Sequence, residues 1–358
     1  MKTIRQPSFE TWEHVVSKCN YATFFHTPTW AHIIVETFPE FHSCTTGFML
    51  DDGVVAIVPI VGTLERNRYF KWCESMFPGG YGSAVAERNL TANELDAIFQ
   101  RLARVDTAYL HVMGNPYIEQ DLPPSYSRSQ QYTHLLNLET GWEAIFGNYS
   151  STKRRHIRKA AKMGVTVSVA QTEQEFRDYY RVYEDTLRRW GTGTLNQYPY
   201  RLFEQIYQQR SEATKLWVAK VNGEIVSGNL ILYHNQNASY WHGATREDYF
   251  DYHPAPLLMN EIISDACQRG LRYYDFGPSG GLEGIERYKE EFGAQRKYFS
   301  SYIWDRNRLY RAYRKLLTLG RSTSDKPSGL QIAGESAVQA TVAQPAARRV
   351  STRPSERG

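Results

Sequence analysis

The chain has 358 residues, of which 41% are apolar and 14% aromatic, which is enough to pack cores and excludes a wholly disordered protein. At roughly 150 residues per domain, this length predicts two domains. The 42 Lys and Arg residues against 38 Asp and Glu give a net charge of +4. Such a charge permits an anionic ligand without indicating a basic surface over the whole molecule.

The cysteines predict neither a metal site nor a disulfide framework. They stand at positions 19, 44, 73 and 267, form no C-x-x-C pair and have no histidine cluster beside them. We therefore expect no bound metal and a reducing compartment. The first residues lack the apolar stretch of a signal peptide, and no run of about 18 apolar residues occurs. These features predict a cytoplasmic protein without a transmembrane segment.

The first half of the chain predicts helices, then a hairpin, then a helix and a strand. Helices are expected at 8–19, 29–37 and 92–103, and strands at 45–50, 54–61 and 108–113. The turn between the first two strands is Asp52-Gly53, a dipeptide typical of two-residue hairpin turns.

The second half predicts the same order. Helices are expected at 151–163, 173–189 and 199–209, followed by strands at 215–221, 224–234 and 238–244 around the turn Asn222-Gly223. A helix at 256–269, with apolar residues near helical spacing, then ends at Gly270, and the strand at 272–276 ends at Gly277.

The two halves predict a duplicated domain. The turn glycines Gly53 and Gly223 are 170 positions apart (223 − 53), and Gly114 and Gly277, which close the later strands, are 163 apart (277 − 114). Chance recurrence of common hairpins is the alternative. The order is that of the GNAT acyltransferase fold and not of a doubly wound parallel sheet.

We therefore predict an α/β protein of the α+β type with two tandem GNAT-like domains. Each is expected to have a mixed, mostly antiparallel sheet flanked by helices, at residues 1–140 and 141–320. The tail 321–358 has no aromatic residue and is rich in Ser, Ala, Gln, Pro and Arg, so we expect it to be disordered.

A basic helix is predicted over residues 152–163. Six of the ten residues from Lys153 to Lys162 are Lys or Arg, and Arg154 and Arg158 are like charges four residues apart, which disfavours the helix slightly. The segment is either a solvated helix face or a cradle for the phosphates of a nucleotide, a tRNA backbone or a lipid diphosphate.

Asp275 and Lys289 are the predicted catalytic residues. Asp275 stands at the end of a strand that opens into a glycine-rich loop, where α/β folds place ligands. Lys289 lies on a short predicted helix after that loop, where a cation could neutralise a phosphate or a developing oxyanion. The alternatives are a capping aspartate and a plain surface lysine.

Four motifs resemble the Fem-type peptidyltransferases and their relatives among the GNAT-like acetyltransferases of cell-envelope operons. They are YDFG…YKEEFG at 273–293, STKRRHIRKAAKMGV at 151–165, FFHTPTW at 24–30, and a Y-x-x-T-x-x-R helix at 183–191 with its arginine at Arg188 or Arg189. The resemblance covers about residues 5–310.

The resemblance implies transfer of an acyl or aminoacyl group to an amine or hydroxyl of a cell-envelope or polysaccharide precursor, peptidoglycan included. It implies no cofactor beyond the donor substrate, which would be an acyl-CoA or an aminoacyl-tRNA. It also implies binding roles for several residues beyond the catalytic pair: Arg154, Arg158, Arg189, Gly79, Gly80, Tyr81, Phe292 and Gly293.

Two departures from the family bear on the donor. The place of a glycine-rich pyrophosphate loop reads YHPAP at 252–256, and its prolines supply no amide N–H, which counts against ordinary CoA binding. No long helical arm interrupts the second domain. How a tRNA would be recognised is therefore open, and acyl-CoA and aminoacyl-tRNA both stay open as the donor. DNA is not an expected partner, and peripheral contact with a membrane stays open. The alternative function is a non-catalytic module that binds RNA or an anionic carrier through the helix at 152–163.

Overall fold

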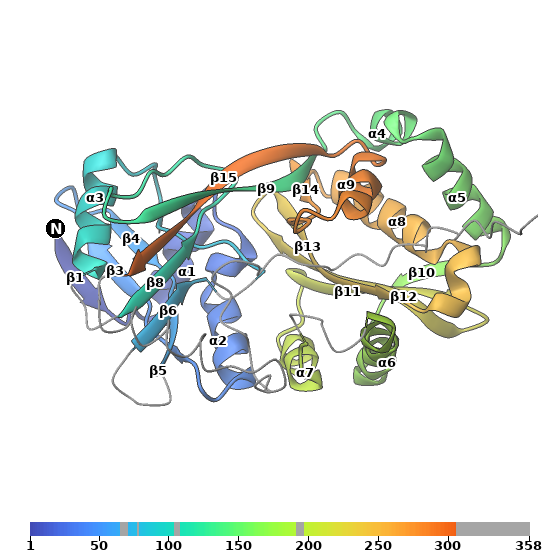
Figure 1. The fold of residues 1–358 in the computed structure, drawn as a ribbon, viewed down its shortest axis with the longest axis horizontal. Coiled ribbons are helices and arrows are strands. Elements are labelled where there is room, and N and C mark those ends of the chain that lie inside the picture. Colours follow the sequence, from blue (N-terminus) through green and yellow to red (C-terminus); the bar gives the residue numbers. More distant parts are fainter. Residues whose placement is uncertain (65–70, 77–78, 104–107, 191–196, 306–358) are drawn as a thin grey trace, which may run out of the picture.

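The computed structural model describes residues 1–64, 71–76, 79–103, 108–190 and 197–305. Its strands form a four-stranded and an eleven-stranded sheet, with helices packed along them (Figure 1). The tail predicted to be disordered, 321–358, lies outside the described residues.

The smaller sheet belongs to the first half of the chain and is antiparallel throughout. Its strands, in spatial order, are β1 (Lys2–Arg5), β3 (Thr46–Met49), β4 (Val55–Val58) and β7 (Val85–Ala86). The single strand predicted at 54–61 is wrong, because the chain leaves this sheet after β4. Pro59 follows, and since it has no N–H for the ladder, the next strand joins the other sheet.

The larger sheet runs through both halves of the molecule. Its order is β10-β11-β12-β13-β14-β9-β15-β8-β6-β5-β2, and only the pairs β13–β14 and β6–β8 are parallel. The bounds are β2 (His42–Ser43), β5 (Val61–Leu64), β6 (Lys71–Ser75), β8 (Tyr109–Met113), β9 (Ser127–Asn137), β10 (Thr166–Val169), β11 (Thr214–Val221), β12 (Glu224–His234), β13 (Asn237–Thr245), β14 (Tyr273–Asp275) and β15 (Gln295–Asp305).

Two long strands that sequence analysis did not detect join the halves. β9 and β15 pair from Gln295 opposite Leu135 to Ile303 opposite Ser127, and β15 also pairs with β8. Figure 1 shows them as the ribbons that bridge the two lobes. The two predicted domains therefore share one sheet, with a strand from the predicted second domain hydrogen-bonded to a strand of the first.

The predicted helices are confirmed to within about two residues at either end. Ser8, Thr27 and Ser150 cap three of them with side-chain oxygens that accept backbone N–H groups. The helices are α1 (Phe9–Lys18), α2 (Pro28–Thr37), α3 (Ala92–Leu102), α4 (Trp142–Asn148), α5 (Ser151–Lys162), α6 (Glu173–Trp190), α7 (Tyr200–Gln208), α8 (Pro254–Gln268) and α9 (Glu283–Glu290), with short 3-10 turns at Phe24–His26 and Glu247–Tyr252.

Burial follows the predicted apolar spacing. On α8 the side chains of Leu258, Ile262, Ile263 and Ala266 are completely buried. They pack with β11 and β12 in a core that also contains the end of β14 and the loop after α9. This core fixes the position of the segments that carry the predicted catalytic residues.

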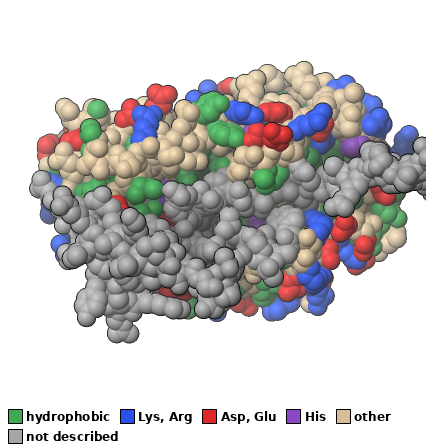
Figure 2. All heavy atoms as spheres, viewed as in Figure 1, with side chains coloured by type: hydrophobic (Ala, Val, Ile, Leu, Met, Phe, Trp, Pro, Cys, Tyr) green, Lys and Arg blue, Asp and Glu red, His purple; other side chains and the backbone are tan. Residues whose placement is uncertain are grey.

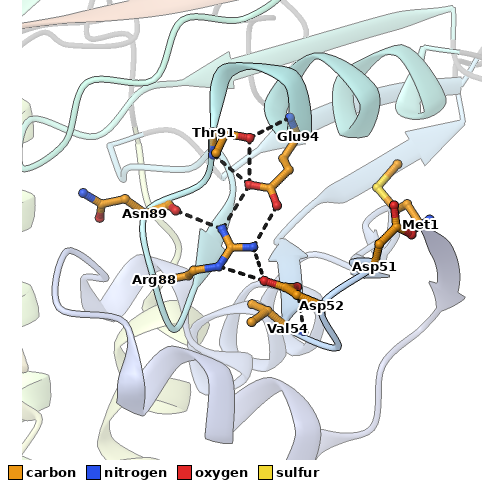
Figure 3. Close-up of polar contacts among 8 residues, drawn as sticks. All are labelled: Met1, Asp51, Asp52, Val54, Arg88, Asn89, Thr91 and Glu94. Atoms are coloured by element: carbon orange, nitrogen blue, oxygen red, sulfur yellow. Dashed lines mark hydrogen bonds and ion pairs between the residues drawn. The ribbon is translucent and has the colours of Figure 1, made fainter.

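A polar cluster ties the first hairpin to α3. Arg88 donates to Asp52 in the Asp52-Gly53 turn (Nη2 to Oδ2, 2.5 Å) and to Glu94 in the first turn of α3 (Nη2 to Oε1, 2.8 Å) (Figure 3). Glu94 also accepts from the backbone N–H of Thr91, whose hydroxyl accepts from the N–H of Glu94. This reciprocal capping box fixes where α3 begins.

The surface carries no field of a single sign on the face drawn in Figure 2, where Lys and Arg side chains are interspersed with Asp and Glu. This mixture agrees with the low net charge of +4. On this face, an anionic ligand would therefore be held by a local group of cations.

Replacing Thr91 by Ala should lower the free energy of unfolding by about 1 kcal/mol, because the capping hydroxyl is lost while Glu94 and Arg88 remain. Urea unfolding of the full chain measures this difference. Asn93→Ala, at an exposed position of the same helix, is the matched control and should change stability by less than about 0.5 kcal/mol. Equal effects of the two substitutions would contradict the role of the cap.

Candidate functional site

The candidate site lies where two parallel strands part. β13 and β14 pair from Asn237 opposite Tyr273 to Ser239 opposite Asp275. β14 then ends, whereas β13 continues to Thr245. The carboxyl ends of parallel strands are where open α/β sheets bind ligands, particularly where neighbouring strands diverge. Asp275 occupies this point, as its place at the end of a predicted strand suggested.

The carboxylate of Asp275 is buried and accepts hydrogen bonds from three segments of the chain. Tyr81 donates to Oδ2 at 2.6 Å, Thr133 donates to Oδ1 at 2.6 Å, and the backbone N–H of Gly277 donates to Oδ1 at 2.8 Å. The hydroxyl of Tyr117 makes a longer contact of 3.5 Å with Oδ2. Burial raises the pKa of Asp275, and these donors, which favour the charged form, oppose that effect.

Lys289 is also buried, with 1% of its surface exposed. Its Nζ donates to the carbonyls of Gly277 at 2.5 Å and Pro278 at 3.0 Å. Burial lowers the pKa of Lys289 to about 7, against the opposing attraction of Asp275 and Glu286. The alternative of a plain surface lysine is therefore wrong. This amine changes its charge near neutral pH, as groups that take part in chemistry often do.

Asp275 and Lys289 both hydrogen-bond to the backbone of Gly277, one at its N–H and the other at its carbonyl. Gly277 donates its N–H to Asp275 and accepts from Lys289 at its carbonyl, and it has a φ of 69°. Glycine adopts this left-handed backbone without strain. The turn thus places a buried carboxylate and a buried amine around a single loop at the end of β14.

The first half of the chain contributes Tyr81 to this site. The loop before Tyr81 packs closely, since a Cβ on Gly80 would lie 2.7 Å from the ring of Phe25 and one on Gly79 would lie 3.3 Å from Trp241 Nε1. The predicted group Gly79, Gly80 and Tyr81 is thus brought to the second half, and Tyr81 reaches Asp275 itself.

The predicted basic helix is less available than its composition suggested. Lys153 is buried against Glu291 (Nζ to Oε2, 3.0 Å) and lies 3.8 Å from the centre of the Tyr288 ring. Arg154 donates to the carbonyls of Gly147 and Tyr149, which end α4. Two of the six cations are therefore bound within the fold, whereas the four others are exposed: Arg155, Arg158, Lys159 and Lys162.

Arg189 lies apart from Asp275, at the far end of β13. Its Nη1 donates to the carbonyl of Thr245 at 3.4 Å, and its guanidinium lies 4.9 Å from the ring of Phe250. Its Nη2 is buried and has no hydrogen-bond partner within the described part of the chain, and burial lowers the pKa of Arg189. An unpartnered guanidinium N–H of this kind is suited to an anion.

Phe292 and Gly293, from the predicted YKEEFG motif, end the segment after α9. The ring of Phe292 is fully buried. Its centre lies 5.0 Å from the ring centre of Tyr149 and 5.3 Å from that of Tyr288. Gly293 has a φ of 84°, which explains the glycine. Among the described contacts, Phe292 thus holds α9 in the core and does not contact Asp275.

Sequence analysis missed four residues near these groups. Thr133 and His134 lie on β9, a strand that was not detected. His134 is buried, its Nδ1 lies 3.3 Å from Ser279 Oγ, and burial followed by the charge of Lys289 lowers its pKa to about 4. His156 and His253 stack at 4.0 Å between ring centres. The histidine on the predicted basic helix was the available signal for the last pair.

A pocket of about 290 Å³ lies between α5, the start of α8 and α9. It is lined by the stacked histidines, by Pro254 and Pro256, and by the cations Lys153 and Arg287. The prolines remove amide donors at the start of α8, as expected from YHPAP, so cationic side chains and not backbone N–H groups would contact a phosphate here.

Comparisons with known proteins found similarity in sequence and in fold. Residues 147–290 match the family model described as an acetyltransferase (GNAT) domain. A stretch of 98 residues is 26% identical to lipid II:glycine glycyltransferase of Staphylococcus haemolyticus strain JCSC1435, covering 27% of this chain and 23% of the relative. The chain thus matches about a quarter of that relative's length.

Solved structures extend the likeness to most of the chain. The crystal structure of FemX matches with a TM-score of 0.67 and 13% identity, over 87% of this chain and 99% of that one. The chain has a fold like that of FemX, and its residues 147–290 are similar to a GNAT domain. The predicted resemblance and the predicted α/β fold class are confirmed. The C-terminal domain of a putative lysylphosphatidylglycerol synthetase from Agrobacterium fabrum also matches, with a TM-score of 0.56 and 11% identity, over 87% and 95% of the two chains.

Two further features concern partners. Within the ranges that the structure describes, no helix is both long and apolar enough to cross a membrane. In the same ranges, no group of three or more His, Cys, Asp or Glu side chains is arranged to hold a metal ion.

The stability contributed by Lys289 should rise with pH. Since burial lowers its pKa to about 7, the folded protein releases this proton above about pH 7, whereas the unfolded chain keeps it up to the ordinary lysine value. The unfolded state then binds more protons, so the free energy of unfolding increases with pH in this window. The free energy of unfolding of the wild type, minus that of Lys289→Met, should therefore increase between pH 7 and pH 9. Urea unfolding measures this difference.

The control for this measurement is Lys18→Met, because Lys18 is exposed on α1. The difference in free energy of unfolding between this variant and the wild type should stay constant over the same pH range. A constant difference for Lys289→Met as well would contradict a lysine that loses its charge near pH 7.

Proposed function

We propose that the protein is an acyltransferase that moves an acyl or aminoacyl group from an activated donor to an amine or hydroxyl of a cell-envelope or polysaccharide precursor. The observation that carries this proposal is the buried pair Asp275 and Lys289 around Gly277, at the point where β13 and β14 diverge within a GNAT domain. The match to a protein named lipid II:glycine glycyltransferase supports an envelope precursor as the acceptor.

The reaction forms one bond and breaks one. The acceptor nitrogen or oxygen attacks the donor carbonyl, and a C–N or C–O bond forms as the C–O bond to tRNA or the C–S bond to CoA breaks. The acceptor proton passes to the leaving group. Negative charge develops on the carbonyl oxygen in between, and a preorganised donor in a buried site stabilises it strongly.

Lys289 is the group proposed to stabilise this oxyanion. Two of its N–H bonds are directed at the carbonyls of Gly277 and Pro278, which leaves one N–H of the ammonium form for the reacting oxygen. Negative charge developing beside it would raise the pKa of Lys289 and favour that charged form. The amine would thus carry its charge at the stage of the reaction that needs it.

Asp275 is proposed to position the site. Of the two roles expected for it, proton acceptor and orienting group, its contacts favour the second, because both oxygens already accept hydrogen bonds. It fixes Tyr81 from the first half and the Gly277 loop that holds Lys289. Loss of this geometry would reduce the rate even though Asp275 itself transfers no proton.

The pocket at the start of α8 is the proposed donor site. Arg287 supplies positive charge and His156 an N–H donor to phosphates, whereas Lys153 already pairs with Glu291, which also lines the pocket. Tyr288 lies on α9, the helix that carries Lys289. Both an acyl-CoA and an aminoacyl-tRNA carry phosphates that suit such a site. The absent amide cradle at Pro254 and Pro256 favours the tRNA.

Donor binding should raise the thermal stability of the purified chain. We expect an upward shift with CoA, acetyl-CoA, a long-chain acyl-CoA or an aminoacyl-tRNA, since a ligand at 100 times its Kd adds about 2.7 kcal/mol. Arg287→Gln should reduce the shift. If none of these donors shifts the unfolding temperature, the transferase proposal is overturned.

Catalysis should depend on Lys289 and Asp275 while donor binding does not. With a donor that binds, Lys289→Met should slow transfer to an amine or hydroxyl acceptor about 100-fold or more, and Asp275→Asn at least about tenfold. Both variants should keep the donor-induced thermal shift. Lys18→Met is the control and should transfer at the wild-type rate.

The same variants test the non-catalytic alternative. A module that binds RNA through phosphates would lose binding when Arg155 and Arg158 become Gln, would depend steeply on salt, and would tolerate Lys289→Met. Binding with that pattern and no transfer would favour the module and contradict the enzyme.

A further inference from the structure

A second cavity, of about 860 Å³, lies at the start of β14, at the other end of that strand from Asp275. It is formed by segments from both halves: the residues after α1 and β8, the C-terminal end of β9, the turn between β12 and β13, and the start of β15. Its volume lies in the range of small-molecule sites, roughly 300 to 1,000 Å³. The proposed transfer reaction does not use it.

The lining of this cavity is rich in carboxamides. Seven of its 21 lining residues are Asn or Gln, among them Asn20, Asn148 and Gln236. A carboxamide offers both N–H donors and a carbonyl acceptor, which suits a ligand with many hydroxyls, because each hydroxyl also donates and accepts. The side chains of Asn148 and Gln236 make no hydrogen bond with another described residue, so they are available to such a ligand.

Asn237 marks a specific contact. Its side chain is buried with 3% exposure, it lines the cavity, and its Oδ1 has no hydrogen-bond partner among the residues that the structure describes. A buried carbonyl oxygen without a donor is costly, and such groups in folded proteins are nearly always paired. A ligand hydroxyl at this end of the cavity would supply the missing donor.

Aromatic rings form one part of the wall. Tyr117 and Tyr273 lie 5.6 Å apart between ring centres, and the guanidinium of Arg272 lies 5.2 Å from the Tyr273 ring. Such rings present flat apolar faces beside polar edges. The C–H face of a pyranose ring packs on a face of this kind while its hydroxyls reach the carboxamides around it.

The charged residues of the lining are all basic. They are Arg272, Arg296 and Lys297, and no Asp or Glu of the described ranges lines the cavity. Arg272 pairs with Glu139 at 3.1 Å and Arg296 with Glu286 at 2.6 Å, whereas Lys297 forms no ion pair with another described residue. An anionic group on the ligand would therefore be attracted, first of all by Lys297.

We propose that this cavity is a binding site for an acidic saccharide, a pyranose that carries a carboxylate or a phosphate. The inference goes beyond the proposed transfer reaction, because it concerns binding at a separate cavity and no chemistry. Tyr117 connects the two sites, because it lines the cavity and its hydroxyl reaches Asp275.

The test is titration calorimetry of the full chain with glucose, glucuronic acid and glucose 1-phosphate. We expect both acidic sugars to bind at least about threefold more tightly than glucose at low salt, with the preference weakened at high salt. The tighter of the two acids identifies a carboxylate or a phosphate as the preferred group. Absence of binding, or equal affinity for all three sugars, would overturn the proposal.

Variants place the binding in this cavity. Gln236→Ala should lower the affinity for all three sugars about three- to tenfold, which is the loss expected for one hydrogen bond. Lys297→Gln should remove most of the preference for the acidic sugars. Both residues are exposed, so the fold should tolerate both changes.

The matched controls are Gln174→Ala and Lys18→Gln, at exposed positions of α6 and α1 outside the cavity, and they should leave binding unchanged. Binding that survives the cavity variants, or that the controls alter equally, would contradict the assignment. The readout uses no donor, so its failure is separate from a failure of the transferase proposal.

Discussion

The candidate site depends on the need to satisfy a buried carboxylate. Burial of Asp275 disfavours its charge, and an ionised group in that position must be hydrogen-bonded. Its donors come from three segments far apart in the chain, at Tyr81, Thr133 and Gly277. The same carboxylate therefore holds the first half of the chain, the bridging strand β9 and the loop after β14 in one arrangement.

Two buried lysines extend this arrangement to α9. Lys289 is held by the carbonyls after Asp275, and Lys153 from α5 is held by Glu291 and the ring of Tyr288. Burial lowers the pKa of both, so each needs its partners. The basic helix thus serves the site partly as a support, by fixing the helix on which Lys289 lies.

The sequence predicted local elements well and long-range ones poorly. Amphipathic spacing and turn dipeptides located α3, α8 and the hairpin of β11 and β12, because these signals act within a few residues. β9 and β15 were not detected, since their outer parts are polar and their pairing joins residues about 170 positions apart. The prediction of a single strand at 54–61 was wrong because β4 ends before Pro59, which has no N–H for the ladder, and the next strand belongs to the other sheet.

The sequence by itself determined the class of fold and the resemblance to Fem-like GNAT proteins, and it predicted Asp275 and Lys289 as candidate residues. Residue types, spacing and motifs are properties of the chain alone. Only the tertiary structure decided which cations are free, that Tyr81 reaches Asp275, and that Lys289 is buried with a pKa near 7. Desolvation and hydrogen bonding depend on what surrounds a group, and those surroundings come from segments that the sequence leaves far apart.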